Sequence, residues 1–546
     1  MVNYCYNQKK MKALLIVPRY TLTDKINYDY SFPLGLAYIC AVIKKAGHEV
    51  DVLNTNHRNG TTEFLLKRAL DSNKYGVVCT GHMGIGHTVV QKIIDFTKEH
   101  KTHPKVIIGG SIITTEPKLM FEDLKPDFGI IGEAEETIVE LLDSLENKKD
   151  LTKVLGIIFE NEGKLVFTGN RPAKENLDEL PMPDYTAFEY EKQLENMSSN
   201  HSPYGLLDYP RVYPMLASRG CVYSCTFCYH CAGYRQRSMN NVVSEIKEAI
   251  KKYKINLIAF YDDLFSFNRE RLFEFCKLIK PIKDSLNGNL YWTCQLTVNG
   301  MDDELLSTMK EAGCYAISYG FESYANEVLI GMRKPATPEK IDNVIKLCMK
   351  HKMTIQGNFI FGDVYETKET AKITLDYWKK EAKGQVYLGW VQPYPGSEIY
   401  DRCIREGIIK DRKDFIHNKI YMTNFYNITK GMKDEEVMQL KNDVLEARRK
   451  YTPYTVPIKM IKENKGFSDR YTLLVKCPFC KEKMQYKNFP IADKFVYTFW
   501  NSCKNCRMRI DIASPLYLLG VKHHDKVEGL RKIYLRLRRD FLKNKI

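Results

Sequence analysis

The chain has 546 residues, more than one hydrophobic core normally holds, so we expect at least two domains and a small third. Lys and Arg number 82 against 67 Asp and Glu, and this net charge of +15 leaves open an anionic substrate, a nucleic acid, an anionic membrane surface or simply solvated helix faces. No apolar run reaches the roughly 18 residues of a membrane span, and Ala13–Val17 is too short for a signal-peptide core. We therefore expect a cytoplasmic protein whose 16 cysteines bind metal or lie in the core rather than form disulfides.

Residues 1–150 alternate short aliphatic runs with amphipathic stretches, and glycines mark the switches. This pattern predicts βα units around a parallel sheet, and so a doubly wound, Rossmann-like α/β domain. Loops at the carboxyl ends of such strands surround a crevice where these domains bind ligands. The glycines expected at that edge, each of which can also serve only to close a tight turn, are Gly81, Gly109, Gly110 and Gly132.

A connector is predicted for residues 151–212, with a β-hairpin around Asn161–Gly163 and a proline-rich stretch after it. A second βα series occupies residues 213–400. Its six apolar strands predict a full or partial (β/α) barrel, with its chemistry at the carboxyl ends of the strands. The remaining predicted parts are a helical segment at 401–469, a cysteine-paired module at 470–515 and a basic tail at 516–546.

Three cysteines stand in the spacing CxxxCxxC just after a predicted strand, at Cys221, Cys225 and Cys228. Three soft thiolates can hold three irons of a cubane and leave the fourth iron open to a substrate or cofactor. Cys231 lies outside this spacing, and we expect no iron bond from it. The loop therefore predicts a [4Fe–4S] cluster, and a chance group of core cysteines is the alternative.

This triplet, with the aromatic Phe227 before its last cysteine, resembles the signature of the radical S-adenosylmethionine (SAM) superfamily. The resemblance covers about residues 213–400, where the segments YDD, SYGFES, GNFIFGDVYET and QPYPGS follow in the order of the family's later strand motifs. Each segment is weak alone, and their order and position carry the resemblance. It implies that SAM is contacted by Asp262, Asp263, Gly320, Glu322, Gly357, Phe359 and Gly362.

The N-terminal domain resembles the cobalamin-binding domain fused to one large radical SAM class, through Pro33–Tyr38, Gly109-Gly110-Ser111 and Gly129–Glu133. Many other cobalamin domains bind cobalt through a DxHxxG loop. The segment Thr55–Gly60 lacks its Asp and follows a different strand, so we expect no cobalt ligand at His57. The resemblance implies a corrin over the strand ends, facing the cluster, near Gly81, His82, Gly109, Gly110, Ser111, Gly132 and Glu133.

Two CxxC knuckles separated by 22 residues supply Cys477, Cys480, Cys503 and Cys506. This pattern predicts one tetrahedral zinc with every position filled, and hence a structural or docking role; a second iron–sulfur cluster is the alternative. In the tail, apolar residues recur at helical spacing among Arg and Lys, at Leu530, Ile533, Tyr534, Leu537 and Phe541. Such a helix lies on an anionic membrane, binds nucleic acid or packs on its own protein, and we favour packing.

Together these resemblances imply an enzyme that cleaves SAM reductively at its cluster to make a 5′-deoxyadenosyl radical, and that uses cobalamin to methylate an unactivated carbon of a small molecule. A reduced flavodoxin or ferredoxin is the expected electron donor. Two alternatives stay open: a radical SAM cyclase or rearrangement enzyme without methyl transfer, and a non-enzymatic cobalamin- or zinc-dependent regulator that binds nucleic acid. The sequence identifies neither the substrate nor a catalytic side chain.

Overall fold

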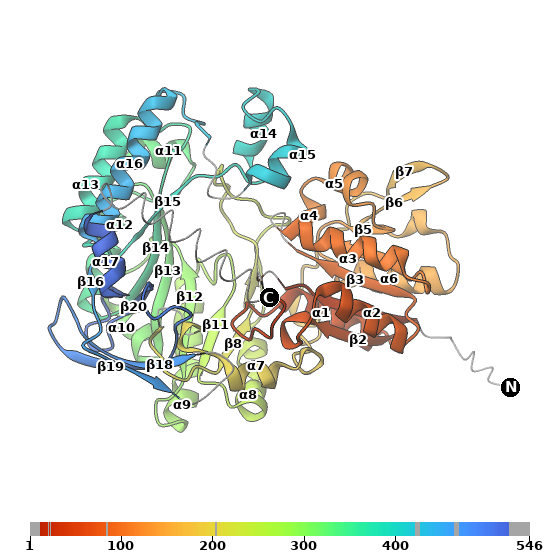
Figure 1. Cartoon of the computed structure of the whole chain (residues 1–546), viewed down its shortest axis with the longest axis horizontal. Helices are drawn as coiled ribbons and strands as arrows, with labels where there is room; N and C mark the ends of the chain where they lie inside the picture. Colours follow the sequence, from red (N-terminus) through yellow and green to blue (C-terminus); the bar gives the residue numbers. More distant parts are fainter. Residues whose placement is uncertain are drawn as a thin grey trace.

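The computed structural model describes residues 11–19, 21, 23–82, 86–201, 205–420, 426–463 and 469–523. Two sheets built mainly from parallel strands stand side by side, the N-terminal one at the right of Figure 1 and a barrel-like one at the left, where a β-rich C-terminal module also lies. The predicted α/β fold is confirmed. The apolar residues of the predicted tail, from Leu530 onward, lie outside the described residues.

The N-terminal sheet has seven strands in the order β2-β1-β3-β4-β5-β6-β7. Its first five are parallel, as predicted, and they place β1 between β2 and β3, where the strand order reverses. The hairpin predicted in the connector forms β6 and β7, which extend this sheet by antiparallel pairing with β5. The bounds are β1 Lys12–Val17, β2 Glu49–Asn54, β3 Val77–Gly81, β4 Lys105–Gly109, β5 Phe128–Ile130, β6 Ile157–Asn161 and β7 Lys164–Phe167.

Helices cover both faces of this sheet because alternate residues of its strands are apolar. Leu15 of β1 packs in the same core as α1 (Leu34–Lys45) and α6 (Glu135–Glu146), whereas Leu14 and Ile16 pack with α2 (Thr62–Ser72) and α3 (His87–Glu99). Helices α4 (Ser111–Thr114) and α5 (Pro117–Leu124) pack in another cluster, with Val106 and Ile108 of β4.

The connector joins the two sheets through an aromatic cluster. The ring of Tyr185 stacks on Phe32 at a centroid distance of 4.8 Å and lies 4.4 Å from the ring of Tyr213, the second residue of β8. Its hydroxyl donates to the carbonyl of Pro214. Asp184 accepts a hydrogen bond from Lys44 of α1 at 2.6 Å. The apolar core therefore runs without a break from the N-terminal domain into the barrel.

The barrel has six parallel strands in the order β8-β11-β12-β13-β14-β15, and β8 and β15 do not pair. The predicted barrel is therefore a partial one. Its strands are β8 Val212–Met215, β11 Leu257–Phe260, β12 Tyr291–Leu296, β13 Cys314–Glu322, β14 Thr354–Phe361 and β15 Tyr387–Trp390. Its helices are α8 Met239–Tyr253, α9 Arg269–Ser285, α10 Asp303–Glu311, α11 Asn326–Gly331, α12 Pro338–Lys350 and α13 Lys368–Lys380.

The segment after the barrel, predicted to be helical over 401–469, is helical only as far as Tyr451. The C-terminal module begins before residue 470, because β16 (Tyr454–Thr455) and β17 (Lys459–Glu463) pair with its strands. Helices α14 (Glu398–Arg405) and α15 (Arg412–Asp414) lean on the N-terminal domain, where Tyr400 donates to Glu116 at 2.8 Å. Helix α16 (Asp434–Tyr451) packs on α13 at the outside of the barrel (Figure 1). None of the helices that the structure describes combines the length and apolar character needed to cross a bilayer.

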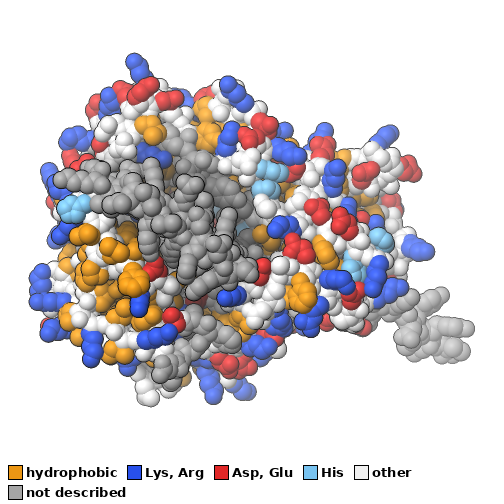
Figure 2. Space-filling view, viewed as in Figure 1, with side chains coloured by type: hydrophobic (Ala, Val, Ile, Leu, Met, Phe, Trp, Pro, Cys, Tyr) orange, Lys and Arg blue, Asp and Glu red, His pale blue; other side chains and the backbone are white. Residues whose placement is uncertain are grey.

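The C-terminal module consists of two small sheets and a short helix, α17 (Pro515–Lys522). It reaches back to the beginning of the chain, because Arg470 lies 3.2 Å from the carboxylate of Asp29 and the side-chain amide of Asn488 donates to the carbonyl of Met197. On the face of the molecule shown in Figure 2, acidic and basic side chains are interspersed and do not form one basic patch. The strands are β16 Tyr454–Thr455, β20 Thr498–Ser502 and β21 Arg509–Ala513 in one sheet, and β17 Lys459–Glu463, β18 Arg470–Lys476 and β19 Lys483–Pro490 in the other.

Ion pairs lock the loop after β5 against the barrel. Both guanidinium nitrogens of Arg235 lie 2.9 Å from the carboxylate of Glu133, and Arg219 contacts Glu133 at 3.3 Å and Glu135 at 2.6 Å. Burial opposes the charge on Glu133, but the hydrogen bonds from Arg235 and the charge of Arg219 outweigh it and lower the pKa of this carboxyl. Glu133 therefore fastens the two sheets to each other.

We predict that Glu133→Gln lowers the free energy of unfolding of the cofactor-free protein at pH 7 by about 2 kcal/mol, because two charge-assisted bonds are lost. A carboxyl with a lowered folded-state pKa stabilises above its unfolded pKa of about 4.3, and this gain disappears as the pH falls through the folded value. Denaturant titrations at pH 7 and pH 4 measure it. The control is Glu122→Gln, which alters a solvent-exposed pair with Lys118 on α5. Equal losses in the two variants would contradict the assignment.

Candidate active site between two sheets

The cysteine loop leaves the barrel between two short antiparallel strands, β9 (Ser218–Arg219) and β10 (Arg235–Gln236). Gly220 has φ +73°, and a Cβ there would lie 2.6 Å from the carbonyl oxygen of Gly233, so only glycine lets the base of the loop close. The middle of the loop is held by the backbone of Thr226, whose N–H donates to Met332 at 3.1 Å and whose carbonyl accepts from Ile399 at 3.1 Å.

The three predicted cluster ligands converge inside this loop. The imidazole of His230 faces the sulfurs of Cys221 and Cys228, and its Nδ1 lies 3.3 Å from the carboxylate of Asp263. Cys225 and Cys228 both lie near the ammonium group of Lys334. The three sulfurs do not lie close enough together to bind one metal ion, within the part of the chain that the structure describes. A [4Fe–4S] cluster does not require this, because each thiolate binds a different iron.

Cys231 lies near the contact with the N-terminal domain. Burial and the charge of Glu133 raise the pKa of its thiol, and Arg235 and Arg219 are close enough to lower it. The residues present fit the predicted three-cysteine cluster, with Cys231 outside the ligand set.

The two aspartates predicted after β11 have different environments. Asp262 is 3% exposed and accepts from the N–H of Ala217 at 3.0 Å and from the hydroxyl of Ser218, and burial raises its pKa to about 6. The carboxylate of Asp263 is more than half exposed beside His230. Asp262 therefore fixes the turn that leads into the cysteine loop, whereas Asp263 presents its carboxylate to open space.

The residues predicted to contact SAM at the ends of β13 and β14 are mainly glycines and buried side chains, so their role is to fix the course of the backbone. Glu322 is buried at φ +63° and pairs with Lys334 at 3.0 Å, and a Cβ at Gly320 would collide with both groups. A Cβ at Gly357 would lie 2.3 Å from the ring of Phe321. The side chain of Phe359 is fully buried in the core, so any contact of this residue with SAM must come from its backbone.

Gly362, at φ +83°, donates its N–H to the carboxylate of Glu366. Glu366 is 1% exposed, and its other oxygen has no partner among the described residues. Burial raises the pKa of Glu366 to about 8. This residue was not predicted as functional, and it holds the loop after β14 as a neutral acid near pH 7.

The crevice predicted in the N-terminal domain is a cavity of about 880 Å³ at the carboxyl ends of β1, β3, β4 and β5, on both sides of the reversal in strand order. All seven residues predicted there line it: Gly81, His82, Gly109, Gly110, Ser111, Gly132 and Glu133. At Gly35, Gly109 and Gly132 nothing occupies the space that a Cβ would fill, so these positions leave room for a large flat ligand. The lining therefore fits a corrin.

At two of the predicted positions the backbone itself requires glycine, whether or not a ligand binds. A Cβ at Gly81 would lie 2.3 Å from the carbonyl oxygen of Gly109 on the neighbouring strand, and Gly110 has φ +85°. His57, in the segment that lacks the cobalt-binding pattern, is buried between Tyr28 and Tyr30 and does not line the cavity.

The cavity and the cysteine loop meet at Arg219. Its guanidinium lines the cavity and lies 5.2 Å from the centre of the Tyr38 ring of α1, and its backbone leads through Gly220 directly into Cys221. The sequence carries Arg219 next to the cysteine signature but gives no sign of its role. Nor does any sequence signal identify His230, which lies in the loop two residues after Cys228, or Lys334, which the fold brings to the loop.

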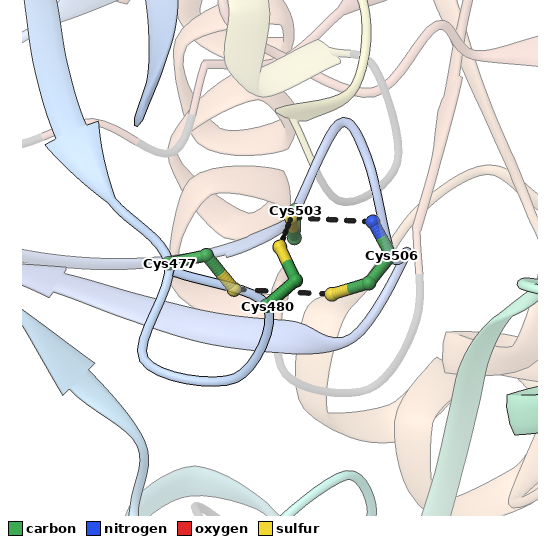
Figure 3. Close-up of side chains that lie close together, drawn as sticks. All are labelled: Cys477, Cys480, Cys503 and Cys506. Atoms are coloured by element: carbon green, nitrogen blue, oxygen red, sulfur yellow. Dashed lines mark hydrogen bonds between the residues drawn. The ribbon is translucent and has the colours of Figure 1, made fainter. Parts of the chain in front are cut away.

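The four C-terminal cysteines form a separate group (Figure 3). All four sulfurs lie within 4.8 Å of one another, with Cys477 3.8 Å from Cys506 and Cys480 3.6 Å from Cys503. A tetrahedron with Zn–S bonds of about 2.3 Å has edges of about 3.8 Å, so the group fits one zinc ion. The N–H of Phe479 donates to the sulfur of Cys477, which stabilises a thiolate in this position.

We predict that Glu366→Gln raises the free energy of unfolding at pH 8.5 by at least about 1 kcal/mol, and that the gain vanishes near pH 4.5. Between these values the unfolded carboxyl, with its ordinary pKa, is ionised while the folded one keeps its proton, so the stability of the unaltered protein falls as the pH rises. Denaturant titrations at the two pH values test this. The exposed change Glu248→Gln on α8 is the control, and a pH-independent gain would refute the prediction.

Comparison with known proteins identifies both halves of the site. Residues 21–142 match the B12 binding domain family and residues 215–378 match the radical SAM superfamily. An uncharacterized methyltransferase of Pyrococcus horikoshii is 27% identical over 73% of this chain and 85% of its own length. The cytidylyl-2-hydroxyethylphosphonate methyltransferase of Streptomyces wedmorensis is 26% identical over 82% of this chain and 92% of its own.

The same arrangement occurs in a solved structure, that of the radical S-adenosylmethionine methyltransferase TsrM from Kitasatospora setae with cobalamin and a [4Fe–4S] cluster bound. It is 17% identical, covers 72% of this chain and 78% of its own, and has a TM-score of 0.59, which establishes the shared fold. Residues 21–142 are therefore a B12-binding domain and residues 215–378 a radical SAM domain, and the cofactors that these two families use are cobalamin, SAM and a [4Fe–4S] cluster.

Proposed function

We propose that this enzyme methylates an unactivated carbon of a small molecule in a cobalamin-dependent reaction. The observation that carries the proposal is the position of Arg219, which lines the cavity that fits a corrin and leads directly into the cysteine loop. When bound, the cluster and SAM supply the radical that removes hydrogen, and cobalamin supplies the methyl group. Both matched relatives described above are methyltransferases, which supports methyl transfer over a radical rearrangement.

Each group of residues has a distinct task in this proposal. Cys221, Cys225 and Cys228 hold the cluster, and with Cys231 outside the ligand set one iron stays open for SAM. Asp263, with its accessible carboxylate, and the buried Glu322–Lys334 pair lie on either side of the loop, where they orient the amino and carboxylate groups of SAM. Gly35, Gly109 and Gly132 give the corrin its space.

The surroundings of these residues keep water away from the reaction. The N-terminal cavity takes most of its lining from apolar side chains and backbone, and the barrel strands and the N-terminal sheet are parts of one continuous core. We expect the electron to come from a reduced flavodoxin or ferredoxin. A nucleic acid partner is not favoured, because on the face in Figure 2 acidic side chains are interspersed with the basic ones.

The proposal predicts that Cys225→Ala loses its iron and that its SAM cleavage falls to background after anaerobic reconstitution, because two remaining thiolates cannot hold the cubane. The control is Cys231→Ser, which should keep the iron content of the unaltered enzyme. Iron analysis and chromatography of 5′-deoxyadenosine measure both. Persistent cleavage by the Cys225 variant would overturn the cluster assignment, and loss of iron in the Cys231 variant would show that the triplet is chosen wrongly.

Methyl transfer is tested with SAM that carries a deuterated methyl group, supplied with hydroxocobalamin, a reductant and a metabolite extract. Mass spectrometry should find the label in a product of the unaltered enzyme and not in that of the Cys225 variant. Formation of 5′-deoxyadenosine with no labelled product would favour the rearrangement reaction instead.

We also propose that Cys477, Cys480, Cys503 and Cys506 hold one zinc ion in a closed tetrahedral site. Cys503→Ser should then lose that zinc and lower the free energy of unfolding by several kcal/mol, on the order of the binding energy that a structural zinc contributes. Metal analysis and thermal unfolding measure these effects, with Cys231→Ser as the cysteine control outside the module. Iron in this site in place of zinc would instead support a second iron–sulfur cluster.

A further inference from the structure

The first part of the predicted tail is helix α17, which is apolar but is not packed into the protein. Five of its eight residues are Leu, Tyr or Val, and none of the eight is buried. A helix of this composition is normally covered by the rest of its protein, because apolar side chains in contact with water cost free energy. Within the described part of the chain, α17 therefore keeps an apolar face without a cover.

The uncovered face is a stripe formed by Leu516 and Leu519. These side chains are three residues apart, so they lie on the same side of the helix, and they are 50% and 55% exposed. Lys522, three residues further along, is also exposed. Tyr517 turns toward the module instead, where its ring lies 6.2 Å from the ring of Tyr454. Figure 2 shows hydrophobic side chains gathered at the left, in the region where Figure 1 places α17.

The spacing of this stripe continues in the sequence after α17. Steps of three and four residues, which mark one face of an α-helix, lead from Leu519 through His523 to further apolar positions. These positions are Val527, Leu530, Tyr534, Leu537 and Phe541. Residues 522–546 also contain nine Lys and Arg against three Asp and Glu. The sequence thus combines an apolar stripe with a strongly basic remainder.

An anionic lipid surface satisfies both properties at once. Helices that lie in the headgroup region place apolar side chains between the lipids and direct Lys and Arg to the phosphates. The sequence alone favoured packing of the tail on its own protein, but such packing would bury the stripe, and the structure leaves Leu516 and Leu519 exposed. A second copy of the chain would bring the same positive charge to the contact, and nucleic acid gives exposed leucines no apolar partner.

We propose that α17 and the basic segment after it form a membrane-docking face, which binds the enzyme peripherally to bilayers that contain anionic lipids. Leu516 and Leu519 enter the boundary between headgroups and acyl chains, and the basic residues of 522–546 bind the lipid phosphates. No residue of α17 lines the cavity that fits a corrin, so this docking does not depend on the proposed reaction.

Co-sedimentation of the full, reconstituted enzyme with lipid vesicles tests this face. Vesicles of phosphatidylcholine with about one third phosphatidylglycerol should bind the enzyme at least about tenfold more tightly than phosphatidylcholine alone, because several basic residues lie at the anionic surface. Added salt should weaken binding to the anionic vesicles, because it screens these charges. No binding to the anionic vesicles, or equal binding to both kinds, would overturn the proposal.

Variants locate the contact on α17. Leu516→Gln with Leu519→Gln keeps helix propensity and should weaken binding to the anionic vesicles about tenfold, because two apolar side chains no longer enter the lipid. The matched control is Leu155→Gln with Ile373→Gln, which changes two exposed apolar residues, one in the N-terminal domain and one on α13. Metal analysis and thermal unfolding check that both proteins stay folded. Equal vesicle binding by the two double variants would refute docking through α17.

Truncation after His523 separates lipid docking from the other possible partners of the stripe. The truncated enzyme should bind anionic vesicles at least about tenfold more weakly, because most of the basic residues are lost. Tighter binding after truncation would mean that residues 524–546 cover the stripe within the protein. A dimer in sedimentation velocity that the α17 double variant breaks would make a second copy the partner. Binding of duplex DNA without binding of anionic vesicles would make nucleic acid the partner. Each of these three results would overturn membrane docking.

Discussion

The charged contact between Arg219, Arg235 and the two glutamates Glu133 and Glu135 determines how the two halves of this enzyme meet. These four side chains are mostly buried, so each charge is stable only when its partner lies beside it. The two parallel hydrogen bonds of Arg235 also fix the orientation of the Glu133 carboxylate, not only its distance. Because Arg219 directly precedes the cysteine loop, the same contact sets the position of the cluster ligands relative to the N-terminal strand ends. The aromatic cluster around Tyr185 supports this contact from the other side of the connector.

A single geometric rule accounts for the placement of both cofactor regions. In each sheet the loops at the carboxyl ends of parallel strands carry the functional residues, and the two sheets turn these ends toward each other. The opposite end of the partial barrel, where its strands begin, lies against the hairpin β20–β21, since Thr354 donates to Ser502. The C-terminal module covers that end, so the interior of the barrel has a wall at each end and the β-strands between them.

The sequence was sufficient where the signal is local. Aliphatic runs with glycine at the switches predicted the strands of both sheets. All seven residues predicted at the N-terminal crevice line one cavity, because the carboxyl ends of parallel strands necessarily share an edge. The four C-terminal cysteines likewise meet, since each knuckle is a local turn.

The sequence was insufficient where side chains distant in the chain decide the environment. Asp262 and Phe359 lie in motifs implied to contact SAM. The carboxylate of Asp262, however, accepts hydrogen bonds from the turn before β9, and the side chain of Phe359 is buried in the core. Lys334 reaches the cysteine loop through folding alone. The role of β20 in the barrel was also invisible, because its contacts join residues about 150 positions apart, such as Thr354 and Ser502.

The contact between Asp29 and Arg470 has a consequence for how the enzyme is made. The two residues are 441 positions apart in the chain, so during synthesis the N-terminal partner leaves the ribosome long before the other exists. Domains usually fold as they emerge, and the N-terminal domain therefore waits with this surface incomplete until the C-terminal module has been translated. Contacts of such long sequence separation form slowly because the loop they close is costly in entropy. The surface around Asp29 is thus completed late in folding, after the N-terminal sheet and the barrel have been made.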